Sequence, residues 1–193
     1  MDFEKGSFRD PAGKIFYKSK RVFRKINKPG INRINFLIDN DLINKSINSQ
    51  FLVESHIVDK DELKKLNIDE NFLIVEHERI PYISYPYEWS FQQLKAAAIH
   101  HLSFHIFLLN NNATLIDASA YNIQFIGFKP IFIDLMSIKK YEEGEFWYGH
   151  KQFCENFLNP LILSSKKSIQ FNNWFKGNLG AAGRSCPSRS TRR

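Results

Sequence analysis

The chain has 193 residues, of which 43% are hydrophobic and 15% aromatic, so it can form one ordinary domain or two small lobes with a packed core. Its formal charge of +7 falls to +3 without the four arginines of residues 177–193, which argues against nucleic-acid binding. Cys154 and Cys186 form no paired motif, and Met1–Lys5 is too polar for a signal peptide, so we expect a cytoplasmic protein without a membrane span.

The composition changes abruptly at Gly177. Residues 177–193 contain no aromatic residue, no Ile and no Lys, and arginine alone carries their charge. Two explanations remain open, a disordered basic tail and a foreign, non-native extension, and the second is favoured. In both cases we predict that this tail lies outside the fold.

The first 80 residues favour a β-rich lobe, the lobe 1–80. Turn residues and β-prone residues predict a hairpin over Ser7–Ile26, and apolar residues at helical spacing predict one helix over Asn32–Ile47. Further elements are predicted as two strands, Leu52–Val58 and Phe72–His77, and a short polar helix or turn, Asp61–Leu66. Residues 81–90 contain two prolines and four aromatic residues, and they predict a stiff, extended hinge.

Residues 91–176 are predicted to form a helical lobe. Ser90 and Gln93 have the spacing of a capping box, so a long helix should begin there and end near Leu109. Its predicted buried stripe is Phe91, Leu94, Ala98, Leu102 and Leu109. The elements predicted after it are a strand over Ile123–Phe128, a turn at Lys129-Pro130, a strand over Ile131–Ile133, and a helix over Tyr148–Leu163 that Pro160 distorts near its end.

The most informative motif lies between Leu115 and Ile138. Asp117 and Asn122 are five residues apart in a predicted loop, and Asp134 ends the second strand of the hairpin that follows. In phosphoryl transfer one carboxylate accepts the proton of the acceptor hydroxyl, while an asparagine oxygen and a second carboxylate bind a divalent ion. Magnesium prefers such hard oxygen ligands. The spacing therefore makes Asp117 a candidate catalytic base, and Asn122 and Asp134 candidate metal ligands.

This motif resembles the protein-kinase and aminoglycoside-phosphotransferase superfamily, and the order of the predicted elements also fits that superfamily. The resemblance implies an α+β, two-lobed protein-kinase-like fold with a truncated C-terminal lobe, ATP and Mg as cofactors, and a small-molecule or glycan-type acceptor. Lys25 would match the phosphate-pairing lysine, and Tyr85 with its aromatic neighbours would stack on adenine at the hinge.

The chain also departs from that pattern. Leu115-Ile116 precede Asp117 where the superfamily has His-Arg or His-Gly. The only candidate phosphate loop is Ser7–Ala12 between two glycines, and the helix over Asn32–Ile47 has no glutamate to pair with Lys25.

A second, narrower resemblance covers about residues 6–163. The strings Ile80–Lys95, Asp117–Phe125 and Lys151–Cys154 are similar to the N-terminal region of bacterial proteins described as class I SAM-dependent methyltransferases, some of them nodulation proteins. In that family the methyltransferase domain lies C-terminal to this region. The resemblance thus implies that SAM would bind only to such a further domain. Two alternatives remain for this chain: an active or degenerate kinase-like module that binds a nucleotide and Mg, or a non-catalytic substrate-binding or scaffolding module.

Simpler structural roles stand beside each functional one. Asp117 and Asn122 can build a turn, Asp134 can cap a helix, and Lys25 can be a solvated strand lysine. The hinge aromatic residues can pack between lobes. His100, His101 and His105 fit a helix face better than a zinc site, because zinc needs three or four ligands and no partner is evident. Cys154 is predicted to be a core residue without an activating base.

Overall fold

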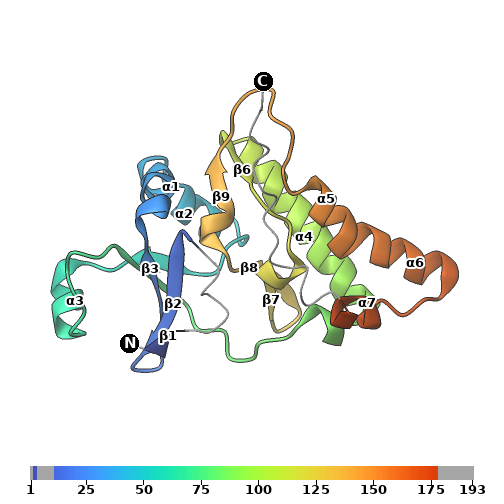
Figure 1. Cartoon of the computed structure of the whole chain (residues 1–193), viewed down its shortest axis with the longest axis horizontal. Coiled ribbons are helices and arrows are strands. Elements are labelled where there is room, and N and C mark those ends of the chain that lie inside the picture. The colour runs from blue at the N-terminus through green and yellow to red at the C-terminus, as the bar shows by residue number, and fades with distance from the viewer. Residues whose placement is uncertain (1, 4–10, 178–193) are drawn as a thin grey trace, which may run out of the picture.

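The structure is a computed structural model that describes residues 2–3 and 11–177. It is a mixed assembly of strands and helices. A five-stranded antiparallel sheet lies at one end, helices α4 to α7 lie at the other, and strands β6 to β9 lie between them (Figure 1). The predicted tail begins at Gly177, but that residue is the last one of helix α7, so its exclusion from the fold is wrong. Residues 178–193, including Cys186, and most of the candidate phosphate loop Ser7–Ala12 lie outside the described residues.

The sheet has the strand order β1-β2-β3-β5-β4. Its strands are β1 (Asp2–Phe3), β2 (Gly13–Lys18), β3 (Arg21–Ile26), β4 (Ser55–Ile57) and β5 (Ile74–His77). Ser19 and Lys20 join β2 to β3 and have φ of 50° and 65°, the two left-handed positions that a tight antiparallel hairpin needs. The predicted hairpin is therefore confirmed for its described part.

Alternation along β3 sends neighbouring side chains to opposite faces of the sheet. Phe23 packs in a small core with Phe16 and Ile74, beneath helix α3 (Lys60–Lys65). Ile26 joins the large core on the other face, which also holds residues of α4 and of β6 to β9. The Arg24 side chain therefore faces the large core, whereas the Lys25 side chain faces the small core. The two adjacent residues can contact only groups on their own side of the sheet.

The predicted helix over Asn32–Ile47 is two helices, α1 (Lys28–Asp39) and α2 (Leu42–Asn48). Asp41 breaks the helix because it adopts a left-handed conformation with φ of 54°. The predicted strand over Leu52–Val58 is also shorter than expected. Residues 51–53 leave the sheet and bond instead to β8, where Val53 N–H donates to the Phe132 carbonyl at 2.9 Å.

Helix α4 (Phe91–Leu109) begins as predicted. The Ser90 hydroxyl accepts a hydrogen bond from the Gln93 N–H, and the Gln93 side chain accepts one from the Ser90 N–H. The predicted stripe is wrong at Leu102 and Leu109, which are exposed, because His101, Phe104, His105 and Leu108 take the buried positions. The described helices include none that is long and apolar enough to cross a bilayer.

Strands β6 (Ala113–Leu115) and β9 (Ile138–Lys140) pair with each other, as do β7 (Ile123–Ile126) and β8 (Lys129–Phe132). The turn between β7 and β8 is Gly127-Phe128, with φ of 62° at Gly127, and Pro130 lies inside β8. The predicted turn at Lys129-Pro130 is therefore wrong, because a glycine accepts the left-handed turn position more readily than the prolyl dipeptide.

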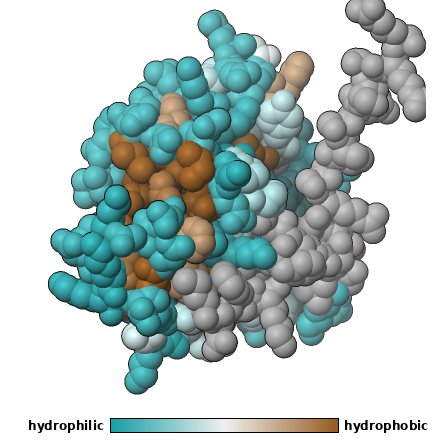
Figure 2. All heavy atoms as spheres, turned by 60° about the vertical axis from the view of Figure 1, so that its left-hand side comes forward, coloured by the Kyte–Doolittle hydropathy of each residue, from teal (hydrophilic) through white to brown (hydrophobic). Residues whose placement is uncertain are grey.

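The C-terminal part of the described chain is helical. It consists of α5 (His150–Phe153), a π-helical turn η5 (Cys154–Leu158), α6 (Asn159–Lys167) and α7 (Asn172–Gly177). Pro160 has no N–H to donate to the carbonyl four residues earlier, so the regular hydrogen-bond ladder cannot continue through it. On the face seen in Figure 2, hydrophobic side chains reach the surface within largely hydrophilic surroundings.

Candidate functional site

The structure brings Asp117, Asn122 and Asp134 together between the sheet and α4. Asp117 follows β6, Asn122 ends the 3₁₀ turn η3 (Ala120–Asn122), and Asp134 follows β8 and begins the 3₁₀ turn η4 (Leu135–Ser137). The Asn122 amide nitrogen donates to Asp117 Oδ1 at 2.7 Å. That bond uses the nitrogen end of the amide, which leaves the amide oxygen as the atom that can bind a cation.

Ser137 links the two carboxylates and was not among the predicted site residues. Its hydroxyl lies 2.5 Å from Asp134 Oδ2 and 3.3 Å from Asp117 Oδ1, and the residue is buried. The sequence signal for it is its place three residues after Asp134, in the turn that Asp134 caps through the Met136 N–H at 3.3 Å. The capping role that the sequence left open for Asp134 is thus present in the same residue.

The Asp117 carboxyl group lies in an environment that changes its pKa strongly. Burial is the larger cause and the nearby negative charge of Asp134 the second, and together they raise the pKa of Asp117 to about 7 although hydrogen bonds from Ser137, the Ser119 backbone and Asn122 oppose them. Burial favours the neutral form of a carboxyl group, and a like charge does the same. A carboxyl that titrates near neutrality can accept or release a proton at physiological pH.

Arg24 brings a positive charge to this site. Its guanidinium lies 2.9 Å from Asp134 Oδ1, and the side chain is buried. It reaches the site because it occupies the large-core face of β3. The sequence signal for Arg24 is alternation: if Phe23 packs into one core, the next residue must face the other way.

Lys25 lies on the opposite face of β3. Its ammonium group is 3.2 Å from the centre of the Phe72 ring, on the side of the sheet that carries the small core. The structure therefore does not bring Lys25 to Asp117, Asn122 and Asp134. Tyr85 is also apart from the cluster: it is partly exposed in the hinge and stacks on Tyr87 at a ring separation of 5.3 Å.

Other residues that the sequence drew attention to have separate partners. His100 bonds to the Phe51 carbonyl at 3.0 Å and His105 to the Thr114 hydroxyl at 2.9 Å, whereas His101 lies among aromatic rings in the large core. Cys154 is half-buried rather than in the core, and its sulfur lies 4.0 Å from His150 Nε2, so the expectation of no neighbouring base is wrong.

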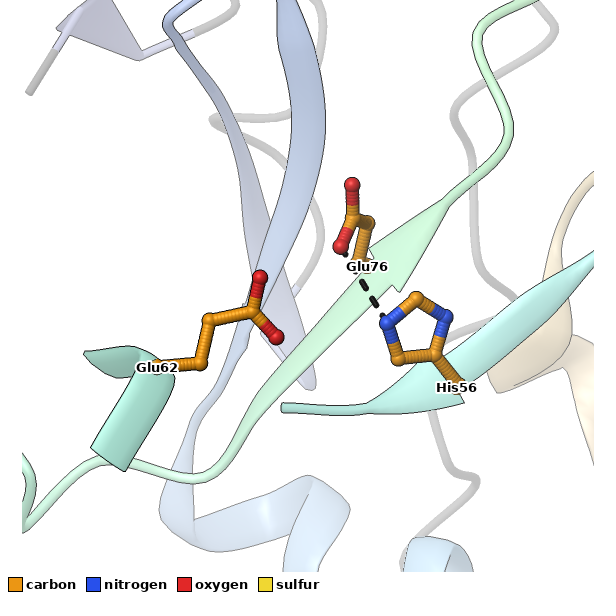
Figure 3. A group of neighbouring side chains, drawn as sticks. All are labelled: His56, Glu62 and Glu76. Carbon is orange, nitrogen blue, oxygen red and sulfur yellow. Dashed lines mark ion pairs between the residues drawn. The ribbon is translucent and has the colours of Figure 1, made fainter. Parts of the chain in front are cut away.

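A second polar cluster lies on the small-core side of the sheet. His56, Glu62 and Glu76 come from β4, α3 and β5, and their ligand-type atoms all lie within 4.8 Å of one another (Figure 3). Arg21 already binds both carboxylates, at 2.6 Å to Glu62 and in a two-point contact with Glu76, and His56 lies 3.2 Å from Glu76. The guanidinium provides the positive charge, so this cluster is an ion-pair network that ties α3 to the sheet.

No family model matches the chain. The chain is 41% identical over 174 residues to the nodulation protein NoeA of Rhizobium meliloti (strain 1021); that alignment covers 90% of this chain and 36% of the relative, so the chain spans about a third of that protein's length. Among solved structures, vaccinia related kinase 3 matches 74% of this chain with a TM-score of 0.45 and 15% identity, over 49% of the kinase chain.

The match to NoeA fits the nodulation-protein part of the predicted resemblance. The description of the relative names neither SAM nor a methyltransferase.

Proposed function

We propose that this chain is a kinase-like module that binds ATP together with Mg²⁺, with the β-rich part and the helical part as the two lobes of a shortened kinase-like fold. The convergence of Asp117, Asn122 and Asp134 carries the proposal. Three oxygen-bearing side chains come from two separate loops, and they meet at one half-buried place with a guanidinium beside them. A simple turn-building role would not require the two loops to meet.

The residues present fit a magnesium ion by their donor chemistry. The Asp134 carboxylate and the Asn122 amide oxygen are the hard ligands that Mg²⁺ prefers, and one or two protein carboxylates with phosphate oxygens commonly complete such a site. When bound, the ion would neutralise charge on the phosphate groups of the nucleotide. The protein side chains would then hold the phosphate groups in place.

Arg24 provides the phosphate contact in this proposal, in place of Lys25. A guanidinium presents several fixed donors and binds phosphate or carboxylate groups in a two-point geometry. In the structure it is held by Asp134 at 2.9 Å. With a nucleotide and its metal ion bound, the Arg24 guanidinium would bind phosphate oxygens, and the Asp134 carboxylate would be free of it to hold the cation.

Asp117 is the proposed proton acceptor for an acceptor hydroxyl. Its pKa of about 7 gives it a substantial neutral fraction near neutral pH in the absence of a cation. A cation held by Asp134 would lower that pKa, because it offsets the negative charge that helps to raise it. In that state Asp117 would be in the ionised form that can take up a proton. The acceptor class that we propose is a small molecule or glycan-type alcohol.

Methyl transfer is not part of this proposal for these residues. The 193-residue sequence contains no Gly-x-Gly turn after a strand, the usual backbone site for SAM. A scaffolding role within a longer protein remains the second candidate function, and only the length of the relative favours it, since the match spans 36% of that protein.

The test is titration calorimetry of the chain with ATP in the presence of Mg²⁺. We expect saturable binding that Arg24→Met weakens at least tenfold and that Lys25→Met leaves within twofold of the wild type. The two variants remove adjacent basic residues from the same strand, so they differ only in the face that they affect. Equal losses in both variants, or binding that survives in Arg24→Met, would show that the cluster of Asp117, Asn122 and Asp134 does not hold the phosphates.

A further inference from the structure

The loop that carries Asp117 is held by side chains from one later segment of the chain, residues 147–156. Trp147 Nε1 donates to the Leu115 carbonyl at 2.9 Å. The Gln152 side-chain oxygen accepts from the Ala118 N–H at 2.8 Å. These contacts bracket Asp117 on both sides.

Asn156 adds a third contact further along the loop. Its side-chain oxygen accepts from the Ala120 N–H at 3.2 Å. Ala118 and Ala120 are both fully buried. Neither lies in a strand, so without these side chains each N–H would lack the partner that a buried backbone donor requires.

We propose that Gln152 and Asn156 are positioning residues for the candidate site, which fix the loop backbone on either side of Ser119 and so set where the Asp117 carboxylate lies. This inference rests on the proposed function for its chemical meaning. The structural part concerns only how the loop is held. Neither residue is placed to touch a nucleotide or an acceptor; both act through the backbone of the loop.

The helix that presents the two amides has an irregularity at this point. Gln152 lies in α5 and Asn156 in the π-helical turn η5, where the Asn159 N–H bonds to the Cys154 carbonyl, five residues back. Pro160 follows directly and cannot donate to the Asn156 carbonyl. Single π-helical turns are frequent at functional sites, where they change the direction in which side chains point. Here the turn carries one of the two residues that hold the loop.

The side chains of Gln152 and Asn156 are uncharged, which suits a site that already holds two carboxylates. Asp117 and Asp134 already repel each other, and Arg24 compensates one of them. Glutamate or aspartate at positions 152 and 156 could accept the same hydrogen bonds, but each would add another negative charge beside the pair. An amide oxygen satisfies the backbone N–H without that added repulsion.

The experiment uses NMR spectroscopy of the full chain. In Gln152→Leu, which lacks the acceptor, we expect the Ala118 amide to exchange its hydrogen at least tenfold faster and the Asp117 carboxyl to change its pKa by at least half a unit. In Gln152→Glu, which keeps an acceptor, the Ala118 amide should regain its protection while the pKa of Asp117 rises. Lys151→Ala, on the exposed side of the same helix, should change neither quantity.

The outcomes separate the possible errors. If Gln152→Leu lowers the melting temperature but leaves both Ala118 exchange and the pKa of Asp117 unchanged, Gln152 only supports helix packing and the inference is wrong. If Gln152→Leu does not fold, Gln152→Glu and Asn156→Asp decide, since loss of Ala118 or Ala120 protection in those variants would also overturn it. Failure of the wild type to bind ATP with Mg²⁺ refutes the proposed function alone, because the exchange and titration measurements require no ligand.

Discussion

Replacement of Asp117 by asparagine should stabilise the protein, and increasingly so as the pH rises. Asparagine keeps an oxygen to accept the hydrogen bond from Asn122, but it carries no charge beside Asp134. The pKa of Asp117 rises from an ordinary 3.8 to about 7 in the folded chain. The carboxyl group of the unfolded chain ionises about three pH units earlier than that of the folded chain.

The sign and size of the effect follow from proton binding. Between about pH 4 and about pH 7 the folded state holds one more proton than the unfolded state at this group, so the free energy of unfolding of the wild type falls as pH rises. Each pKa unit is worth about 1.4 kcal/mol, so the total is about 4 kcal/mol. The difference between Asp117→Asn and the wild type should therefore grow from a small value near pH 4 to a plateau above pH 7.

Urea unfolding at closely spaced pH values measures that difference directly. The matched control is Asp39→Asn, which makes the same substitution at an exposed carboxylate at the end of α1. A variant that is less stable than the wild type at pH 8, or a stability gain that shrinks as pH rises, would refute the assignment of Asp117 as a half-buried carboxyl repelled by Asp134.

Three further predictions concern the surrounding structure. In urea unfolding, His101→Phe should raise the free energy of unfolding by about 2 kcal/mol more at pH 5 than at pH 7.5. Burial lowers the pKa of His101 to about 3, so at pH 5 the unfolded state of the wild type takes up a proton at this residue and the folded state does not. An equal gain at both pH values would contradict this. Arg21→Met should lower the free energy of unfolding by about 1–3 kcal/mol, because the half-buried Glu76 loses its cation; an unchanged urea midpoint would show that the network is only a surface ion pair. Gly30→Ala should lower the free energy of unfolding by about 1–3 kcal/mol, because a Cβ at position 30 would lie 2.5 Å from the Ala12 carbonyl oxygen. A urea midpoint equal to that of the wild type would mean that the backbone at Ala12 moves away from the added methyl group.

The sequence predicts the elements best where local chemistry determines them. The capping residues of α4 and the hairpin turn at Ser19-Lys20 follow from side-chain and backbone preferences that act within a few residues. Asp41 could not be foreseen as a helix break, because aspartate in a left-handed conformation depends on how α1 and α2 pack. The exposed positions Leu102 and Leu109 likewise depend on which neighbours cover α4.

The candidate site shows the same division. Asp117, Asn122 and Asp134 form a motif that spacing can reveal, and the structure brings them together. Arg24 was missed in favour of Lys25, since the choice between adjacent residues rests on which face of β3 meets the large core. Tertiary packing decides which face that is, and the spacing of residues within a short motif does not reveal it.

The most direct test of the account is the melting temperature of the wild-type chain with ATP and Mg²⁺, compared with SAM and with the ligand-free protein. A ligand at one hundred times its dissociation constant adds about 2.7 kcal/mol, which corresponds to a rise of about 5–10 °C for a chain of this size. We predict that rise with ATP and Mg²⁺, its loss in Asp134→Ala, and no shift with SAM. No shift with ATP and Mg²⁺, or an equal shift in Asp134→Ala, would contradict the proposed nucleotide site.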